Sequence, residues 1–399
     1  MMTTAELDRY QPDAMGALRT AIQRGRLPHA VILSSPGHVG EDELAALLAQ
    51  TLLCERPAGA LAPCNECPQC HLFKTGAHPD FNEVRPKGLM RGIKTDDMLE
   101  LIGRLQATAL MGRAKIGVIH QAESLRKESA NRFLKTLEEP MPGTYFIIVT
   151  TRPERLLPTI KSRCQVIRLR PFDGSVLRER AGVELGLRGK DLELVCTLSR
   201  GRWRRACFLA GHLDEYRVLI KDLASVLCAR GTAAAPAAEC ARAIGDALKA
   251  GRKAFDERCK AELSARAREW SDIEPKVRRE MLDALEEDLK SAQAADERDE
   301  KASLFEALIE LWRDVLVLQW TGDEALVLHQ FLLGQVKSLA AAYAGEEIMR
   351  NLADIDLVRG PAVYLNMRIN LVLQGLLAQA AQPVGQHVPL RRALLATGL

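Results

Sequence analysis

The sequence has few aromatic residues and no excess of charge of one sign. Phe, Trp and Tyr make up 5% of its 399 residues, whereas hydrophobic residues make up 47% and charged residues 27%. A chain this apolar is not typical of disorder, and its length suffices for two or three domains that each bury a core. The formal net charge is +3 at pH 7. Any contact with nucleic acid must therefore come from a local patch or through a partner.

Long apolar runs and an export signal are also missing. No run reaches the ~18 apolar residues that a membrane-spanning helix needs. The opening MMTTAELDRY lacks the basic region and apolar core of a secretory signal. These features predict a cytoplasmic protein without a membrane partner. In that compartment, the ten cysteines do not indicate a disulfide framework.

Four of the cysteines lie close together in the sequence. The segment Cys54-x9-Cys64-x2-Cys67-x2-Cys70 offers four thiolates, and the two-residue spacings let the backbone fold around a tetrahedral Zn²⁺ ion. The segment contains no general base and no open coordination position. We therefore expect a closed, structural zinc site rather than a catalytic one. His71 could compete as a ligand, and an iron–sulfur cluster or unliganded thiols are the alternatives.

Apolar patterning predicts an α/β domain followed by an all-α region. From about residue 28 to residue 171, short apolar runs alternate with helical segments, which indicates βαβ units around a parallel sheet. The expected strands are Ala30 to Ser34, Ile116 to His120 and Tyr145 to Thr150. Each is almost continuously apolar, as strands covered on both faces are. Beyond residue 212 the pattern is helical. Residues 248–301 carry charges of alternating sign, which predicts a solvated helix pair or one extended helix.

The loop after the first expected strand has the outline of a phosphate-binding P-loop but carries inverted charges. In the working motif G-x-x-x-x-G-K-[ST], the lysine neutralises the phosphates and the hydroxyl holds Mg²⁺. The four defining positions fall here on Ser35, Gly40, Glu41 and Asp42. Two carboxylates would repel a triphosphate.

The second expected strand ends without the acidic pair that an ATP hydrolase needs. His120 and Gln121 stand at those two positions. A histidine does not anchor Mg²⁺ as a carboxylate does, and a glutamine is a poor base for water. Two independent losses predict that this chain does not hydrolyse ATP and requires no nucleotide cofactor.

Motifs further along the chain resemble the clamp-loader branch of the AAA+ family. They are ANRFLKTLEEP at residues 130–140, Thr151 after the third expected strand, the Ser162-Arg163-Cys164 signature and His78-Pro79-Asp80 beyond the cysteines. The zinc module after the P-loop helix also fits this family. The resemblance covers about residues 27–209 with specific motifs. Over the C-terminal third it is a matter of helical character alone.

The resemblance implies a three-domain architecture. Residues 1–170 would form a RecA-like AAA+ domain with a zinc module at about 54–70, and residues 171–212 a small helical lid. Residues 213–399 would form a helical oligomerisation collar. The charged segment at about 248–301 is then an insertion in the collar.

The family contains ATPase motor subunits and a rigid subunit that lacks their catalytic residues. The two carboxylates of the loop and the His120–Gln121 pair indicate the second kind. The resemblance thus implies a subunit of a DNA polymerase III complex, with neither ATPase nor polymerase activity of its own. Its partners would be motor subunits, a clamp-opening subunit, the sliding clamp and, through the complex, primer–template DNA. In the family the arginine of the Ser162-Arg163-Cys164 signature reaches a neighbour's ATP, so Arg163 is the predicted arginine finger in trans.

Two alternatives stay open. An ATP-binding, motor-type subunit with an unconventional P-loop would need Arg204 or Arg205, at the family's sensor 2 position, to replace the missing lysine. Otherwise these arginines could pair with Glu41 or Asp42, or be solvated. A zinc-dependent DNA-binding protein would bind DNA through the cysteine segment itself, in a salt-sensitive way.

Overall fold

The computed structural model describes residues 2–86, 92–111, 114–230, 234–271, 274–364 and 367–382. Its contacts divide the chain into two compact units, Met1–Cys207 and Phe208–Leu399, called here the N-terminal unit and the helical unit. The segment predicted as a lid falls mostly in the first of these. The three-domain organisation stays a prediction. No helix of the described part is long and apolar enough to cross a membrane.

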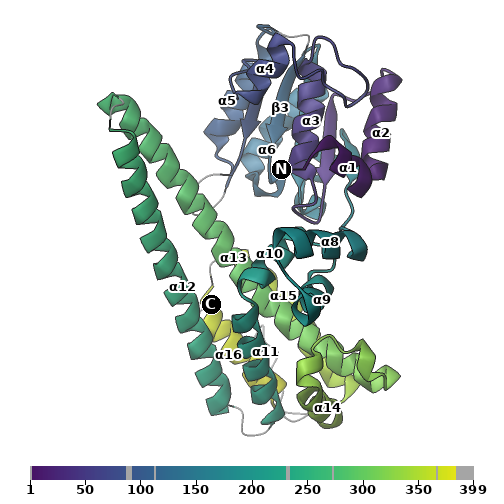
Figure 1. Cartoon of the computed structure of the whole chain (residues 1–399), viewed down its shortest axis with the longest axis vertical. Helices are drawn as coiled ribbons and strands as arrows, with labels where there is room; N and C mark the ends of the chain where they lie inside the picture. The colour runs from purple at the N-terminus through teal and green to yellow at the C-terminus, as the bar shows by residue number, and fades with distance from the viewer. Residues whose placement is uncertain are drawn as a thin grey trace. The chain divides into compact units, whose positions relative to one another are not determined.

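The N-terminal unit is built on a parallel sheet of five strands in the order β2-β3-β4-β1-β5 (Figure 1). The strands are β1 (Ala30–Ser34), β2 (Phe81–Val84), β3 (Lys115–Ile119), β4 (Thr144–Thr150) and β5 (Gln165–Arg168). The predicted α/β fold of the RecA-like type is confirmed, and the three predicted strands differ from β1, β3 and β4 by at most one residue at an end. The outer strands β2 and β5 were not predicted, because they are short and partly exposed.

The N-terminal unit also contains helices. They are α1 (Thr4–Tyr10), α2 (Pro12–Gln23), α3 (Glu41–Leu53), α4 (Pro68–Lys74), α5 (Thr95–Gln106), α6 (Lys127–Glu138), α7 (Pro158–Lys161), α8 (Gly174–Glu184), α9 (Gly189–Ser199) and α10 (Trp203–Gly211), the last of which continues into the second unit. On one face, α5 and α6 pack on Ile32 and Ile148, and the rings of Phe133 and Phe146 meet edge to face with centroids 5.0 Å apart. A Cβ atom at position 117 would lie 2.5 Å from Leu105, so Gly117 allows α5 to approach the sheet.

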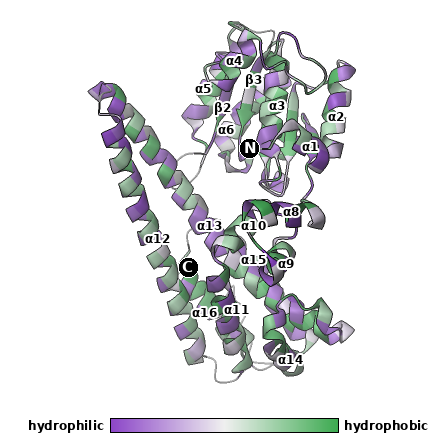
Figure 2. Cartoon of the chain, viewed as in Figure 1, coloured by the Kyte–Doolittle hydropathy of each residue, from purple (hydrophilic) through white to green (hydrophobic). Residues whose placement is uncertain are grey.

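The helical unit consists of α11 (Leu213–Cys228), α12 (Ala234–Glu269), α13 (Pro275–Thr321), α14 (Leu333–Ala342), α15 (Gly345–Tyr364) and α16 (Ile369–Ala380). Its core lies around the C-terminal half of α13, where Phe305, Leu308 and Trp312 are buried. The charged segment forms a pair of helices, as predicted. Figure 2 shows hydrophilic and hydrophobic residues intermixed along both of them.

Candidate functional site

The P-loop-like turn after β1 binds a carboxylate of its own chain. The backbone N–H of His38 donates to Glu41 Oε1 at 2.6 Å, and that of Val39 donates to Glu41 Oε2 at 2.9 Å. Glu41 is 5% exposed. Gly40, with φ +104°, directs the chain into α3. Backbone N–H groups of such a loop are a ready site for a phosphate. Here the carboxylate of Glu41 accepts hydrogen bonds from two of these N–H groups.

A histidine lies between two carboxylates beside this loop. His120 follows β3 and is 4% exposed. Its Nδ1 is 2.7 Å from Asp42 Oδ1 and its Nε2 is 3.1 Å from Glu83 Oε2. Burial lowers the pKa of His120, but the hydrogen bonds to Asp42 and Glu83 outweigh it and raise this pKa above its ordinary value of 6.5. Burial raises the pKa of Asp42, and the bond to His120 outweighs that effect, so the pKa of Asp42 is lowered.

Other residues of the same sheet edge complete the site. Gln121 adopts a left-handed conformation with φ 48° directly after His120. At the end of β4, the hydroxyls of Thr150 and Thr151 donate to the two oxygens of Glu123 at 2.6 and 2.7 Å. The site thus gathers at the carboxyl ends of β1, β3 and β4, where open α/β sheets place their ligands. Glu83 and Glu123 were missed from the sequence.

One of the two arginines expected near the loop contacts a residue of that loop. Nη1 of Arg204 lies 2.9 Å from His38 Nε2, and Arg205 is 8% exposed. The carboxylate of Glu41 accepts bonds from the loop, and that of Asp42 lies against His120. Arg204 therefore reaches the predicted loop, but through its histidine.

Arg163 lies at the opposite end of the strands from the P-loop-like turn. It comes two residues before Gln165, which is paired with Val31 near the start of β1, whereas the loop follows the end of β1. Its Nη2 is 2.5 Å from Glu138 Oε1, and its Nη1 donates to Thr159 O at 3.0 Å. About a third of its side chain is exposed. Because the strands are parallel, Arg163 and the loop lie at opposite ends of the strands and are separated by about the length of a strand.

The flanking residues of the Ser162-Arg163-Cys164 signature have local roles. Ser162 Oγ donates to Thr159 O at 3.0 Å. Cys164 packs against the apolar core, and burial raises the pKa of its thiol to about 12. The signature therefore holds a partly buried thiol on one side of Arg163 and a turn on the other.

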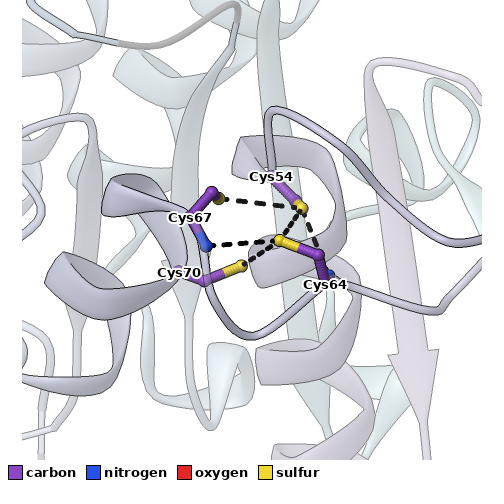
Figure 3. Close-up of side chains that lie close together, drawn as sticks. All are labelled: Cys54, Cys64, Cys67 and Cys70. Carbon is purple, nitrogen blue, oxygen red and sulfur yellow. Dashed lines mark hydrogen bonds between the residues drawn. The ribbon is translucent and has the colours of Figure 1, made fainter.

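The four predicted zinc ligands converge (Figure 3). Cys54 ends α3, Cys67 begins α4, Cys70 lies in its first turn, and Cys64 precedes them in the connecting loop. Their sulfur atoms all lie within 4.8 Å of one another. The Sγ–Sγ distances are 3.5 Å for Cys54–Cys64 and 4.0 Å for both Cys54–Cys67 and Cys64–Cys70.

These distances fit a tetrahedral zinc ion. Four ligands at a Zn–S distance of about 2.3 Å would lie about 3.8 Å apart. The N–H groups of Glu66 and Cys67 lower the pKa of Cys64 to about 6, which favours a thiolate ligand. His71 is exposed on α4, outside this group. A metal ion is thus compatible with the cluster.

The cluster makes a direct prediction about metal content. Cys67→Ser should reduce bound zinc from about one ion per chain to a small fraction, because three sulfurs leave the tetrahedron incomplete. It should also lower the thermal midpoint of the N-terminal unit by about 5 °C or more. Metal analysis and calorimetry measure both quantities. Cys228→Ser, at an exposed cysteine of the helical unit, is the control; equal zinc content in the two variants would contradict the assignment.

The His120 cluster predicts a pH dependence. Because the folded pKa of His120 is raised above 6.5, its contribution to stability is complete below pH 6.5 and is lost as the pH rises through the raised pKa. The lowered pKa values of Asp42 and Glu83 add stability above their ordinary values of 3.8 and 4.5, which is lost in acid. The cluster should therefore stabilise the chain most between pH 4.5 and 6.5.

An NMR titration of His120 tests this prediction. Asp42→Asn should lower the pKa of His120, because one acceptor for its charged form is removed while burial remains. The thermal midpoint should then change less with pH above 6.5. Asp13→Asn removes an exposed carboxylate that pairs with Arg170 and should leave His120 unchanged. A His120 pKa insensitive to Asp42→Asn would refute the cluster.

The match to a known protein family lies within the N-terminal unit. Residues 10–173 match the protein family described as DNA polymerase III, delta subunit. The chain is 40% identical to DNA polymerase III subunit delta' of Pseudomonas aeruginosa over 141 residues, which is 35% of this chain and 43% of that protein. It is 34% identical to the delta' subunit of Bacillus subtilis over 175 residues, or 44% and 52% of the two chains. It is also 33% identical to subunit tau of Escherichia coli over 170 residues, or 43% and 26%.

The matches have clear limits. The chain spans about half the length of the curated delta' relatives it matches. A solved gamma subunit-related protein of Thermotoga maritima covers 92% of this chain and 99% of its own, with 16% identity and a TM-score of 0.41, which is too distant to carry an argument. The motifs, the sheet and the relatives at 34–40% identity together show that the N-terminal part is similar to DNA polymerase III delta' subunits.

Proposed function

We propose that the chain is a non-hydrolysing, delta-prime-like subunit of the DNA polymerase III clamp-loader complex. In this proposal it assembles with ATPase motor subunits and a clamp-opening subunit, and helps to load the sliding clamp onto primer–template DNA. The observation that carries the proposal is the pair of loop N–H groups bonded to Glu41 of the same chain. The chain would supply a group to a neighbour's ATP site instead of using its own.

Electrostatics supports the absence of ATP hydrolysis. A triphosphate at the loop would have to displace Glu41 from two charge-assisted hydrogen bonds, each worth about 1.5–3 kcal/mol. It would also face the carboxylates of Glu41 and Asp42. At about 5 Å and an effective dielectric constant of about 20, each pair of like unit charges costs about 3 kcal/mol. His120, held between Asp42 and Glu83, leaves no carboxylate at its position for Mg²⁺.

The location of Arg163 supports a role in trans. Arg163 and the P-loop-like turn lie at opposite ends of the strands of one sheet, so this guanidinium does not serve the loop of its own chain. Its bond to Glu138 aligns the side chain at a partly exposed position. A guanidinium beside the γ-phosphate of a neighbour neutralises charge that develops in phosphoryl transfer.

Two further parts of the proposal concern architecture. The four cysteines would hold a structural zinc ion, since the donor set is all sulfur and offers no open position. Residues 171–212 would act as the lid and residues 213–399 as the collar. The collar would carry the interfaces with the other subunits.

One observation favours the rival reading of an ATP-binding motor subunit. The guanidinium of Arg204 touches His38 of the loop and brings a positive charge to the place where the lysine is missing. It does not restore the Mg²⁺ ligands. We therefore prefer the non-hydrolysing role.

Arg163→Ala tests the proposal in the reconstituted complex. DNA- and clamp-stimulated ATP hydrolysis should fall about tenfold or more, because arginine fingers contribute at least that much to phosphoryl transfer. Assembly, followed by gel filtration, should be unchanged. Arg155→Ala, at an exposed arginine in the same connection between β4 and β5, should retain the wild-type rate. Equal rates of ATP hydrolysis with Arg163→Ala and wild type would contradict the proposal that Arg163 is an arginine finger.

A further inference from the structure

The side chain of Gln11 is buried and joins two stretches that are far apart in the sequence. It is 3% exposed. Its Nε2 donates to Val39 O at 3.1 Å and to Arg170 O at 2.9 Å, and its Oε1 accepts from the N–H of Arg170 at 2.9 Å. A glutamine amide has two N–H donors and one carbonyl oxygen. Both N–H groups and the carbonyl oxygen of Gln11 are therefore engaged.

The local sequence fixes the backbone of Gln11 at the junction between α1 and α2. Pro12 is the first residue of α2 and disfavours a helical conformation in the residue before it. Gln11 accordingly has φ −130° and ψ 49°. Its N–H donates to Leu7 O at 2.8 Å, and its C=O accepts from the N–H of Met15 at 3.0 Å. The side chain of Gln11 thus starts from a backbone that is bonded to both helices.

One partner of Gln11 belongs to the P-loop-like turn. Val39 is buried. Its N–H donates to Glu41, and its C=O accepts from Gln11. Helix α1 also packs on this turn, because a Cβ atom at Gly40 would lie 2.6 Å from Leu7 Cδ2. Two side chains of the same chain therefore satisfy both backbone groups of Val39.

The other partner lies in residues 169–173, the connection between β5 and α8, called here the hinge. The N–H of Leu169 donates to Ser34 O, at the end of β1, at 2.8 Å. The hinge thus begins where the sheet ends. Gln11 bonds to both backbone groups of Arg170, the next residue. The chain is therefore held to Gln11 at the point where it leaves the sheet.

The far end of the hinge is fastened to the helices that follow it. The N–H of Phe172 donates to Gly201 O at 2.9 Å. The rings of Tyr10 and Phe172 meet edge to face with centroids 5.4 Å apart. Arg9 of α1 pairs with Glu179 of α8 at 2.7 Å. Helix α1 therefore contacts the P-loop-like turn, the hinge and α8.

We propose that Gln11 holds α8 and the P-loop-like turn in a fixed relation, so that the hinge does not pivot. A pivot that separated Gln11 from Val39 or Arg170 would leave a buried polar group without a partner, which is costly. This device needs no bound ligand, because every bond in it comes from the chain itself. The inference goes beyond the proposed function and does not rest on it.

A distance measurement in the full-length chain tests the inference. Spin labels are attached through non-natural residues at Asn131 of α6 and Val183 of α8, which are both exposed, so that the cysteines are left untouched. Electron paramagnetic resonance should give one narrow distance distribution for the wild type. Gln11→Met keeps the length of the side chain but removes its three hydrogen bonds. It should broaden or shift the distribution, because the hinge is released.

Hydrogen exchange gives a second readout. The N–H groups of His38 and Val39 bond to Glu41, not to Gln11. They should nevertheless exchange about tenfold faster or more in Gln11→Met, because the turn loses the bond that ties it to the hinge. Circular dichroism checks that the variant is folded. If it is not, Gln11→Glu replaces it. That variant keeps the acceptor for the N–H of Arg170, loses both donors and should change both readouts in the same direction.

A matched control is another buried glutamine of the N-terminal unit. Gln69 is 5% exposed, and its Nε2 donates to Glu55 Oε1 and Met111 O, both at 3.3 Å. Gln69→Met should leave the distance distribution and the exchange of the turn as in the wild type. Equal changes in the two glutamine variants, an unchanged distribution in the folded Gln11 variant, or a broad distribution in the wild type would each overturn the inference. None of these measurements depends on ATP hydrolysis, which tests the proposed function.

Discussion

The bond between Glu41 and the N–H groups of its own loop is the interaction on which the rest of the N-terminal unit depends. It closes the turn between β1 and α3 without a bound phosphate. The neighbouring Asp42–His120–Glu83 cluster places an imidazole ring between two carboxylates, with one ring nitrogen near each. A loop of this kind would otherwise expose unpaired N–H groups and a concentration of like charge. In our account the fold needs no nucleotide to hold its shape.

In the proposed role, two functions would lie at opposite ends of the strands of one sheet. The loop whose N–H groups donate to Glu41 lies at the carboxyl ends of the strands. Arg163 lies beside Glu138 at their amino ends. The central strands β1, β3 and β4 that join the two ends are buried almost throughout their lengths. In our proposal, such a subunit offers a positioned guanidinium to a neighbour while its own site stays inactive. The proposed role in the clamp loader follows from that division.

The sequence predicted features that depend on local patterns and missed those that depend on three-dimensional folding. The buried strands were predictable from continuous apolar runs, and the cysteine cluster from its spacing. Strand β2 is short and alternates in exposure at the edge of the sheet, so Glu83 could not be placed beside His120. The return of Glu41 onto its loop depends on left-handed residues such as His38, whose conformation no pattern specifies.

Equilibrium binding of ATP with Mg²⁺ to the wild-type chain tests the central claim most directly. If the loop is satisfied by Glu41 and the metal position by His120, isothermal titration should detect no saturable binding up to about 1 mM ATP, which corresponds to less than about 4 kcal/mol of binding free energy. Saturable binding with a Kd in the low micromolar range would contradict the account. It would show that Glu41 yields its place to a phosphate and would favour the motor-type alternative.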